Sequence, residues 1–219
     1  MEHSFTEENY LKAIYKLSDG TGEVSTTELA NALKIKSATV TDMLKKLSAR
    51  KLIKYERYKG LRLTEKGRQV AVRVIRKHRL WELFLVEKLK FGWDEVHDIA
   101  EQLEHIQSDE LINRLDELLG HPKADPHGDP IPDEHGDFSE RSATVLAGKK
   151  TKVAYTIAGV TDDHPNFLKY LDKVGIGLGD KISIISIEPY DQMHQVSVNK
   201  GAEFFISESV ARNILVFGK

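Results

Sequence analysis

Residues 25–63 have the sequence STTELANALKIKSATVTDMLKKLSARKLIKYERYKGLRL, and this stretch decides the fold of the first part of the chain. Its first four residues, Ser25-Thr-Thr-Glu28, form a capping box, which predicts that a helix begins there. A second helix begins at Ser37, with apolar residues at helical spacing. Two short alternating segments, 52–55 and 61–63, then predict a pair of strands joined by a turn.

A further helix is expected ahead of this stretch. Thr6 is placed to cap it, and the negative charges of Glu7 and Glu8 in the first turn would interact favourably with the positive end of the helix dipole. Three helices followed by a strand pair are typical of a winged helix-turn-helix, in which the third helix enters the major groove of double-stranded DNA.

The polar face of the predicted third helix carries residue types that contact DNA. Serine and threonine hydroxyls bond bases or phosphates, while lysine and arginine bond phosphates, which position a protein without specifying sequence. Asp42 is unusual there, and it either accepts from a cytosine amino group or orients a neighbouring lysine. The alternative is a solvated face of a winged helix that binds protein. The candidate DNA contacts are Lys36, Ser37, Thr39, Thr41, Asp42, Lys45, Lys46, Arg50, Arg57 and Lys59.

Charge is divided unevenly along the chain. Residues 1–80 hold 18 of the 32 Lys and Arg residues but only 9 of the 34 Asp and Glu residues, whereas residues 81–219 hold 14 and 25. The basic first part indicates a polyanionic partner. Cysteine is absent, which excludes disulfides, thiolate metal sites and cysteine nucleophiles. Neither a signal-peptide pattern nor an apolar run of about 18 residues is present, so we expect a cytoplasmic protein without a membrane partner.

Residues 97–105, HDIAEQLEH, indicate a metal site. On a helix, His97, Glu101, Glu104 and His105 would lie on one stripe, and apolar residues would take the opposite face. Imidazole and carboxylate groups together are ligands for divalent first-row metals. The alternative is an ordinary solvated stripe of charge.

A long helix is expected between the winged helix and this segment. Thr64 would cap it, and the pattern continues to about Lys90 before the Gly92–Asp94 turn. Residues 81–86 make it apolar around much of its circumference, which is more than a small winged helix can bury. A homodimer interface is the main interpretation; packing against the next two helices alone is the alternative. A helix over 108–120 follows the metal segment.

The last part of the chain changes character. Prolines and glycines between residues 121 and 143 predict a structureless linker. Short strands then follow, which suggest a small barrel. The expected strands are 152–157, 181–187, 195–199 and 203–206, and the expected helices are 166–173 and 208–213.

Five segments of this chain together resemble the diphtheria toxin repressor family of metal-activated transcriptional repressors, most closely its manganese-transport-regulator branch. The segments are YLKAIY (10–15), YERYKGLRLTEKG (55–67), RKHRLWE (76–82), VHD…EH…SDE (96–110) and PHGDPIP (126–132).

The resemblance implies a fold that agrees with the pattern of the residues. It consists of a mainly α N-terminal region, a winged helix-turn-helix followed by a helical dimerisation domain, and then a small all-β SH3-like barrel. The implied boundaries are 1–64 for the winged helix, 65–120 for the dimerisation and metal-binding domain, 121–143 for the proline-rich linker and 144–219 for the barrel.

The resemblance also implies two metal sites. The primary, activating site would use Asn9, Glu101, Glu104 and His105. The ancillary site would use His78, Glu82, His97, Asp125, His127 and Asp163. Iron-type members have a cysteine at the position of Glu101, and a carboxylate there favours Mn²⁺, with Fe²⁺ as the alternative.

The expected function is that of a metal-activated dimeric repressor, without catalytic activity, that binds palindromic operators and controls genes of metal-ion homeostasis. A metalloenzyme using the same ligands is the rival hypothesis. Against it, the sequence has neither the paired Glu-x-x-His of di-iron bundles nor a His-Glu-x-x-His motif. A winged-helix protein that binds no metal is the third hypothesis.

Overall fold

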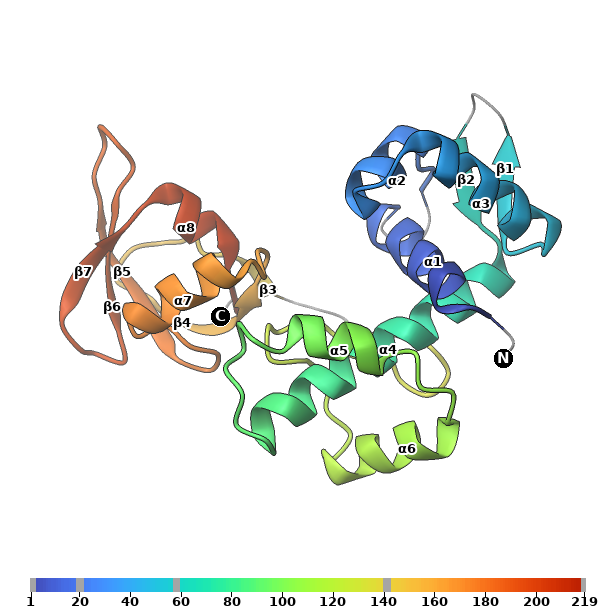
Figure 1. The fold of residues 1–219 in the computed structure, drawn as a ribbon. Coiled ribbons are helices and arrows are strands. Elements are labelled where there is room, and N and C mark those ends of the chain that lie inside the picture. Colours follow the sequence, from blue (N-terminus) through green and yellow to red (C-terminus); the bar gives the residue numbers. More distant parts are fainter. Residues whose placement is uncertain (1–2, 19–21, 57–59, 140–142, 218–219) are drawn as a thin grey trace. The chain divides into compact units, whose positions relative to one another are not determined.

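A computed structural model describes residues 3–18, 22–56, 60–139 and 143–217, which form two compact units (Figure 1). The winged-helix unit comprises Met1–Trp81, Glu101–Leu115 and Pro132–Phe138. The β-domain unit comprises Glu82–Ala100, Asp116–Ile131 and Ser139–Lys219.

The winged-helix unit has the predicted order of elements. It contains α1 (Phe5–Leu17), α2 (Thr26–Leu33), α3 (Ser37–Ala49), β1 (Ile53–Glu56) and β2 (Gly60–Leu63). The two strands pair antiparallel. The core of the winged-helix unit is built from fully buried aliphatic side chains, among them Leu11, Ile14, Leu29, Leu44, Leu47, Leu52 and Leu61. These residues leave the polar face of α3 in solvent.

The helix caps follow the sequence with one correction. Ser25 caps α2 in a reciprocal box with Glu28, as predicted. The cap of α1 is Ser4 and not Thr6, because Ser4 has a glutamate three residues later and Thr6 does not. The Ser4 hydroxyl accepts from the Glu7 N–H at 3.3 Å, and the Glu7 carboxylate accepts from the Ser4 N–H at 2.9 Å.

The long helix α4 (Glu65–Glu87) begins as expected and ends earlier than the predicted Lys90. The Thr64 hydroxyl accepts from the Gly67 N–H at 3.1 Å, which caps the first turn. A Cβ atom on Gly67 would lie 1.9 Å from the backbone oxygen of Leu52. Glycine is therefore required where α4 begins against the strand pair.

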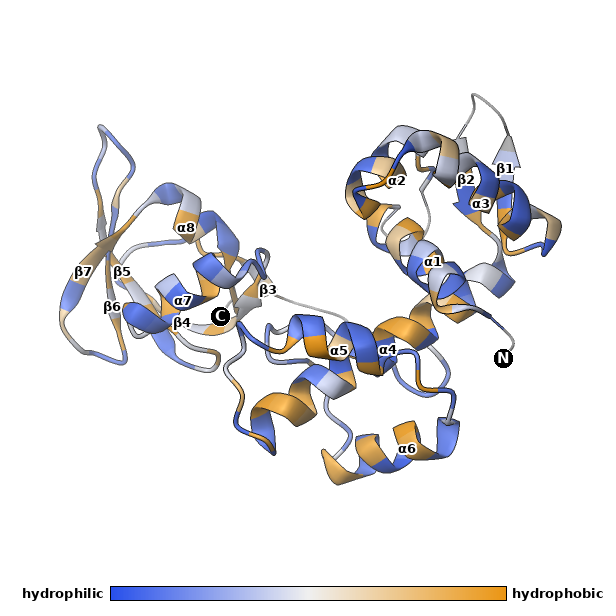
Figure 2. Ribbon diagram, viewed as in Figure 1, coloured by the Kyte–Doolittle hydropathy of each residue, from blue (hydrophilic) through white to orange (hydrophobic). Residues whose placement is uncertain are grey.

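The metal-type segment is only partly helical. Helix α5 (His97–Leu103) ends one residue before Glu104, so Glu104 and His105 lie in the turn that follows it. The prediction of one helical stripe over residues 97–105 was therefore wrong at its C-terminal end. Helix α6 (Asp109–Leu118) comes next, and the Ser108 hydroxyl accepts from the Leu111 N–H at 3.2 Å. Hydrophobic and hydrophilic residues alternate along α6 (Figure 2).

The segment predicted as a structureless linker contains an ordered loop. Around Asp125 the chain turns tightly, because its carboxylate accepts the N–H groups of His127 and Asp129 at 2.8 and 2.9 Å. The Val160 N–H donates to the His127 carbonyl at 2.9 Å, which fixes this loop to β4. Gly128 has a φ of +85°, and a Cβ there would lie 2.1 Å from the Ala158 oxygen.

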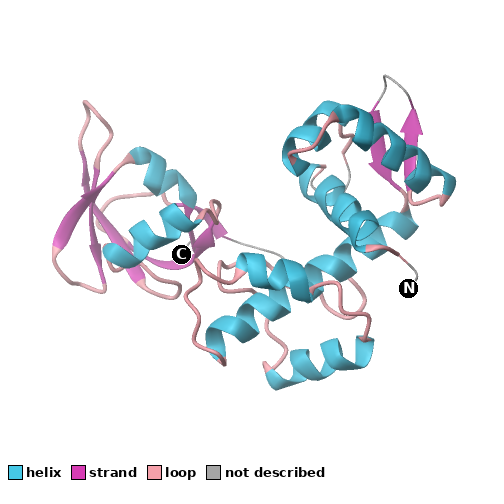
Figure 3. Ribbon diagram, in the orientation of Figure 1, coloured by secondary structure: helices cyan, strands magenta, loops and turns pink. Residues whose placement is uncertain are grey.

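The β-domain unit contains a six-stranded antiparallel sheet in the order β3-β8-β4-β5-β6-β7. The strands are β3 (Ala143–Val145), β4 (Ala154–Val160), β5 (Lys181–Ile187), β6 (His194–Val198), β7 (Glu203–Ile206) and β8 (Ile214–Phe217). Two helices, α7 (Pro165–Lys173) and α8 (Glu208–Asn213), accompany them (Figure 3). The four predicted strands and both predicted helices are present within a few residues, and β3 and β8 were not predicted. No helix in the described part of the chain combines the length and apolarity needed to cross a membrane.

Candidate metal centre

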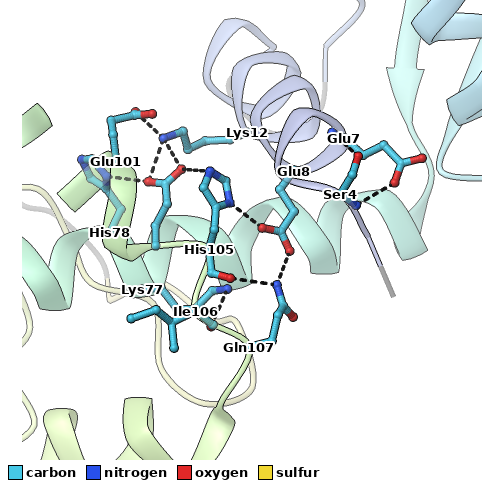
Figure 4. Close-up of polar contacts among 11 residues, drawn as sticks. Ser4, Glu7, Glu8, Lys12, Lys77, His78, Glu101, His105, Ile106 and Gln107 are labelled. Atoms are coloured by element: carbon cyan, nitrogen blue, oxygen red, sulfur yellow. Dashed lines mark hydrogen bonds and ion pairs between the residues drawn. The ribbon is translucent and has the colours of Figure 1, made fainter. Parts of the chain in front are cut away.

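A cluster of charged side chains lies inside the winged-helix unit and joins α1 to α4 and to the end of α5 (Figure 4). At its centre, the Glu104 side chain is completely buried. Its two carboxylate oxygens lie 2.6 and 2.8 Å from the Lys12 Nζ, and one of them lies 2.6 Å from His78 Nδ1. The Lys12 Nζ also donates to Glu101 Oε1 at 2.5 Å. Two of the predicted primary ligands, Glu101 and Glu104, are thus brought together.

The third predicted ligand, His105, lies beside them. Its Nε2 is 3.7 Å from Glu104 Oε1, and its Nδ1 is 2.6 Å from the carboxylate of Glu8 on α1. The other oxygen of Glu8 accepts from the Gln107 side chain at 2.9 Å, and the ring of Phe5 stacks on the imidazole at 4.6 Å. Glu8 is a functional candidate that the sequence did not reveal, because its place in the first turn of α1 was sufficient to explain it.

Asn9, the fourth predicted ligand, leaves a buried acceptor unused. Its Oδ1 is shielded from solvent and has no hydrogen-bond partner within the described residues. Asn9 and Lys12 are three residues apart on α1, so their side chains share one side of the helix. An unpaired buried amide oxygen is costly, and a cation would satisfy it. The carboxylates, the imidazole and this oxygen therefore fit a divalent metal.

Lys77 adds a second buried cation near this cluster. Burial lowers the pKa of Lys77, and the negative charges of Glu8, Glu104 and Asp109 act in the opposite direction. Its Nζ lies 3.4 Å from the backbone oxygen of Ile106, in the turn that follows His105. The negative charge of the cluster is therefore partly balanced by lysines in the absence of a metal.

A second group of metal-type side chains lies inside the β-domain unit. Glu82, Asp125 and His127 are all buried, and each offers a ligand atom within 4.8 Å of the others. His97 joins this group, since its Nδ1 lies 3.4 Å from Glu82 Oε1. Asp163 is exposed and does not belong to the three-residue group.

Trp93 positions the histidine of this second group. Its carbonyl oxygen lies 2.9 Å from His127 Nε2, which must therefore carry the proton, leaving Nδ1 as the ligand atom. The indole stacks on His127 at 6.2 Å, packs against the core of the β domain and donates to Asp172 at 3.0 Å.

His78 was assigned to the ancillary site by resemblance, which stays a prediction, and in the structure it also contacts the first group. The residue lies one turn before Glu82 on α4, and its Nδ1 contacts Glu104 at 2.6 Å.

The residues predicted to contact DNA lie mostly in solvent. Asp42 pairs with Lys45 at 3.0 Å, which is the orienting role that the sequence left open. The Thr41 hydroxyl donates to the Ser37 carbonyl at 2.9 Å, so its oxygen is held close to α3. Arg57 and Lys59 lie outside the described residues. The exposed members are Lys36, Ser37, Thr39, Asp42, Lys45 and Lys46.

Arg50 and Lys46 also contact the body of the unit. Both bind the buried carboxylate of Glu7, at 2.6 and 3.4 Å. Burial alone would raise the pKa of Glu7, but the Ser4 N–H, Arg50 and Lys46 outweigh it and lower the pKa to about 2. Helix α1 is therefore linked to α3 through Glu7 and to the metal-type cluster through Lys12.

Three family descriptions match successive parts of the chain. Residues 4–61 match the N-terminal DNA binding domain of the iron dependent repressor, and residues 64–133 match its metal binding and dimerisation domain. Residues 145–217 match the FeoA domain.

Individual relatives agree with these matches. The iron-dependent repressor IdeR of Mycobacterium tuberculosis is 36% identical over 127 residues, which cover 58% of this chain and 55% of that protein. A helix-turn-helix transcriptional regulator of Methanocaldococcus jannaschii is 41% identical over 109 residues, covering 49% of this chain and 87% of that protein.

The fold agrees as well. A solved structure described as a manganese-dependent transcriptional repressor in complex with manganese has a TM-score of 0.84 and 34% sequence identity, and the match covers 97% of this chain and 100% of that one. Matches with the repressors extend over both the DNA-binding part and the metal-binding part, with the metal-type residues inside the matched ranges. The chain therefore belongs to the iron-dependent repressor family, the family of IdeR and the diphtheria toxin repressor.

Proposed function

We propose that this protein is a metal-activated, dimeric transcriptional repressor, that Mn²⁺ is its activating ion, and that it acts on DNA in the cytoplasm. One observation carries the proposal. The group formed by Glu101 and the buried Glu104 and His105 contacts α1, and α1 in turn binds the C-terminal end of helix α3 through Glu7. A change of charge in this group would therefore affect, through α1, the position of α3, the helix proposed to read DNA.

Asn9, Glu101, Glu104 and His105 would hold the activating ion. When bound, a divalent cation supplies the positive charge that offsets the carboxylates. Asn9 would hold the ion from α1 through its unpaired oxygen, and Glu101 and Glu104 would hold it from the end of α5. The residues thereby hold α1 in one position, which sets the separation of the two recognition helices in a dimer and matches it to the half-sites of a palindrome.

The choice of Mn²⁺ rests on the donor atoms. Two carboxylates, an amide oxygen and an imidazole form a hard set without sulfur, which suits Mn²⁺. Fe²⁺ accepts the same donors and is the alternative, and iron-dependent and manganese-dependent repressors are both among the relatives.

We propose Glu82, His97, Asp125 and His127 as an ancillary metal site. The buried, fixed loop around Asp125 supports it, because a site held within one ordered unit needs little rearrangement to bind. Asp163 stays a prediction, since it lies in solvent in this structure.

The test is an anaerobic calorimetric titration of Mn²⁺ and Fe²⁺ into metal-free protein, with operator affinity measured at fixed salt. We expect Mn²⁺ to tighten operator binding by about 5- to 150-fold, the usual range of such coupling. Glu104→Ala should abolish this tightening and keep weak, salt-sensitive binding to any DNA. The isosteric Glu104→Gln repeats the test with less change in packing.

The matched control is Glu110→Ala, which removes an exposed carboxylate that pairs with Arg114 at 2.7 Å on α6. It should respond to Mn²⁺ like the parent protein. If Glu104→Ala and Glu104→Gln keep the full metal response, the ligand assignment is wrong. If the parent protein binds neither ion, the proposed function itself is wrong.

A further inference from the structure

Lys12 places a positive charge where the proposed function requires a metal ion. The residue is only 6% exposed, and its Nζ lies 2.5 to 2.8 Å from three carboxylate oxygens of Glu101 and Glu104 (Figure 4). A lysine is rarely buried to this extent unless it is paired. This ammonium is therefore a tethered cation held by the same oxygens that would ligate Mn²⁺.

The ammonium and a divalent ion cannot share these oxygens. Metal–oxygen bonds to a first-row ion are about 2.0–2.2 Å long, so an ion on the Glu101 and Glu104 oxygens would lie within a few ångströms of the Lys12 Nζ. Two cations at that separation in a buried site repel each other strongly. The Lys12 ammonium therefore has to move away from the Glu101 and Glu104 carboxylates before these can bind a metal ion.

Lys12 also does part of what the ion is expected to do. It extends from α1 and binds residues 89 and 92 positions later in the chain, so it links α1 to the end of α5 without a metal. The unpaired Asn9 oxygen on the same side of α1 is consistent with an incomplete substitute, since an ammonium cannot reach every donor at once.

We propose that Lys12 is an internal competitor of the activating metal, which raises the metal concentration needed for activation while it keeps α1 partly anchored in the metal-free protein. This inference rests on the proposed function and assigns a regulatory residue within its site. It predicts two opposite effects of removing the charge: tighter metal binding and weaker metal-free DNA binding. A purely structural role would not produce both.

The variants Lys12→Met and Lys12→Gln test the inference. Lys12→Met keeps most of the side-chain volume and removes the charge, and Lys12→Gln keeps hydrogen-bond donors for the case in which the first variant does not fold. The control is Lys16→Met, which removes an exposed charge one turn later on α1. Mn²⁺ affinity is measured by calorimetry, and operator affinity is measured with chelator and with saturating Mn²⁺.

We expect Mn²⁺ binding to tighten about tenfold or more in both Lys12 variants, the scale on which neighbours of a metal site change its affinity. Their metal-free operator affinity should fall below that of Lys16→Met. Unchanged or weaker Mn²⁺ binding in a folded Lys12 variant overturns the inference, and so does unchanged metal-free DNA binding.

A second measurement follows Lys12 in the unaltered protein. An amine-acylating reagent, read by mass spectrometry, should modify Lys12 slowly without metal and faster at saturating Mn²⁺, with Lys16 as the internal reference. Continued protection of Lys12 at saturating Mn²⁺ overturns the displacement. In all of these outcomes the parent protein binds Mn²⁺, and its operator affinity rises with Mn²⁺. If the operator affinity of the parent protein does not rise with Mn²⁺, the proposed function fails instead.

Discussion

Glu7 is the residue that joins the first helix to the DNA-facing helix. Its carboxylate is buried and accepts from the Ser4 N–H while it binds Arg50 and Lys46. Arg50 and Lys46 are predicted to contact phosphates, which stays a prediction, and in the structure both bind Glu7. Glu7 holds both side chains at the C-terminal end of α3, so the structure already restricts their positions.

This arrangement makes the winged-helix unit sensitive to acid. The pKa of Glu7 is lowered from 4.5 to about 2 in the folded protein. Because the folded value is the lower one, its contribution to stability is present above pH 4.5 and is lost as the pH falls toward 2. The change is at most about 3 kcal/mol.

Glu7→Gln should remove this part of the pH dependence, so the unfolding free energies of variant and parent should converge between pH 4.5 and 2. Chemical denaturation at several pH values measures it. Glu65→Gln, which alters an exposed carboxylate, is the control and should parallel the parent. A constant gap between Glu7→Gln and the parent across this range would contradict the assignment.

The candidate site illustrates what single residues reveal. Glu101, Glu104 and His105 were predicted as a group, and the structure brings them together. Glu8 was missed as a member, because it has an ordinary place in the first turn of α1 and its partner His105 lies 97 residues away. Such distant contacts leave no local pattern in the sequence.

At the scale of elements, the junction between β1 and α4 depends on close backbone approach. Thr64 donates its hydroxyl to the Leu52 carbonyl at 3.0 Å, and Gly67 lies against the same carbonyl. The junction fixes where the long helix leaves the strand pair.

Gly67→Ala separates propensity from packing. Helix propensity alone predicts a gain of about 1 kcal/mol for alanine. The Cβ contact of 1.9 Å with the Leu52 oxygen predicts instead a loss of about 1–3 kcal/mol, as in other overpacked sites. Thermal unfolding decides the sign, with the exposed Gln69→Ala as the reference for propensity. A stabilised Gly67→Ala would show that the junction can open at little cost.

Local signals explain which elements could be predicted. The capping box at Ser25 located α2, the helical spacing of apolar residues located α3, and short apolar segments located β5 and β7. The signal was weakest for β3, a three-residue strand, and for β8, a continuous apolar run directly after α8. Both pair with each other and so depend on partners more than 65 residues apart, which local pattern does not report.

At the scale of the whole molecule, the basic and acidic parts of the chain correspond largely to different matched domains. The basic first part contains the DNA-binding match, and the acidic remainder contains the FeoA match and most of the metal-binding match. Acidic parts cannot bind DNA phosphates favourably, so contacts with the operator are expected from the winged helix alone.

Dimerisation is expected to involve α6 as well as the apolar stretch of α4, because two leucines of α6 are exposed in the single chain. Leu111 and Leu118 lie two turns apart on the same face and are 40% and 59% exposed. Leu118→Glu should shift the dimer toward monomer and weaken operator binding, whereas Asn113→Glu on the opposite face should do neither. Sedimentation velocity measures the association state. A fully dimeric Leu118→Glu would exclude this face from the interface.

The contact between Trp93 and His127 has an optical consequence. The chain has two tryptophans, and Trp93 stacks on a candidate ligand of the ancillary site while its indole is packed on the β domain. A paramagnetic ion such as Mn²⁺ bound at His127 quenches an adjacent indole, and a closed-shell ion such as Zn²⁺ does not. With Trp81 replaced by phenylalanine, Trp93 becomes a native fluorescent probe of ancillary-site occupancy, without any added label.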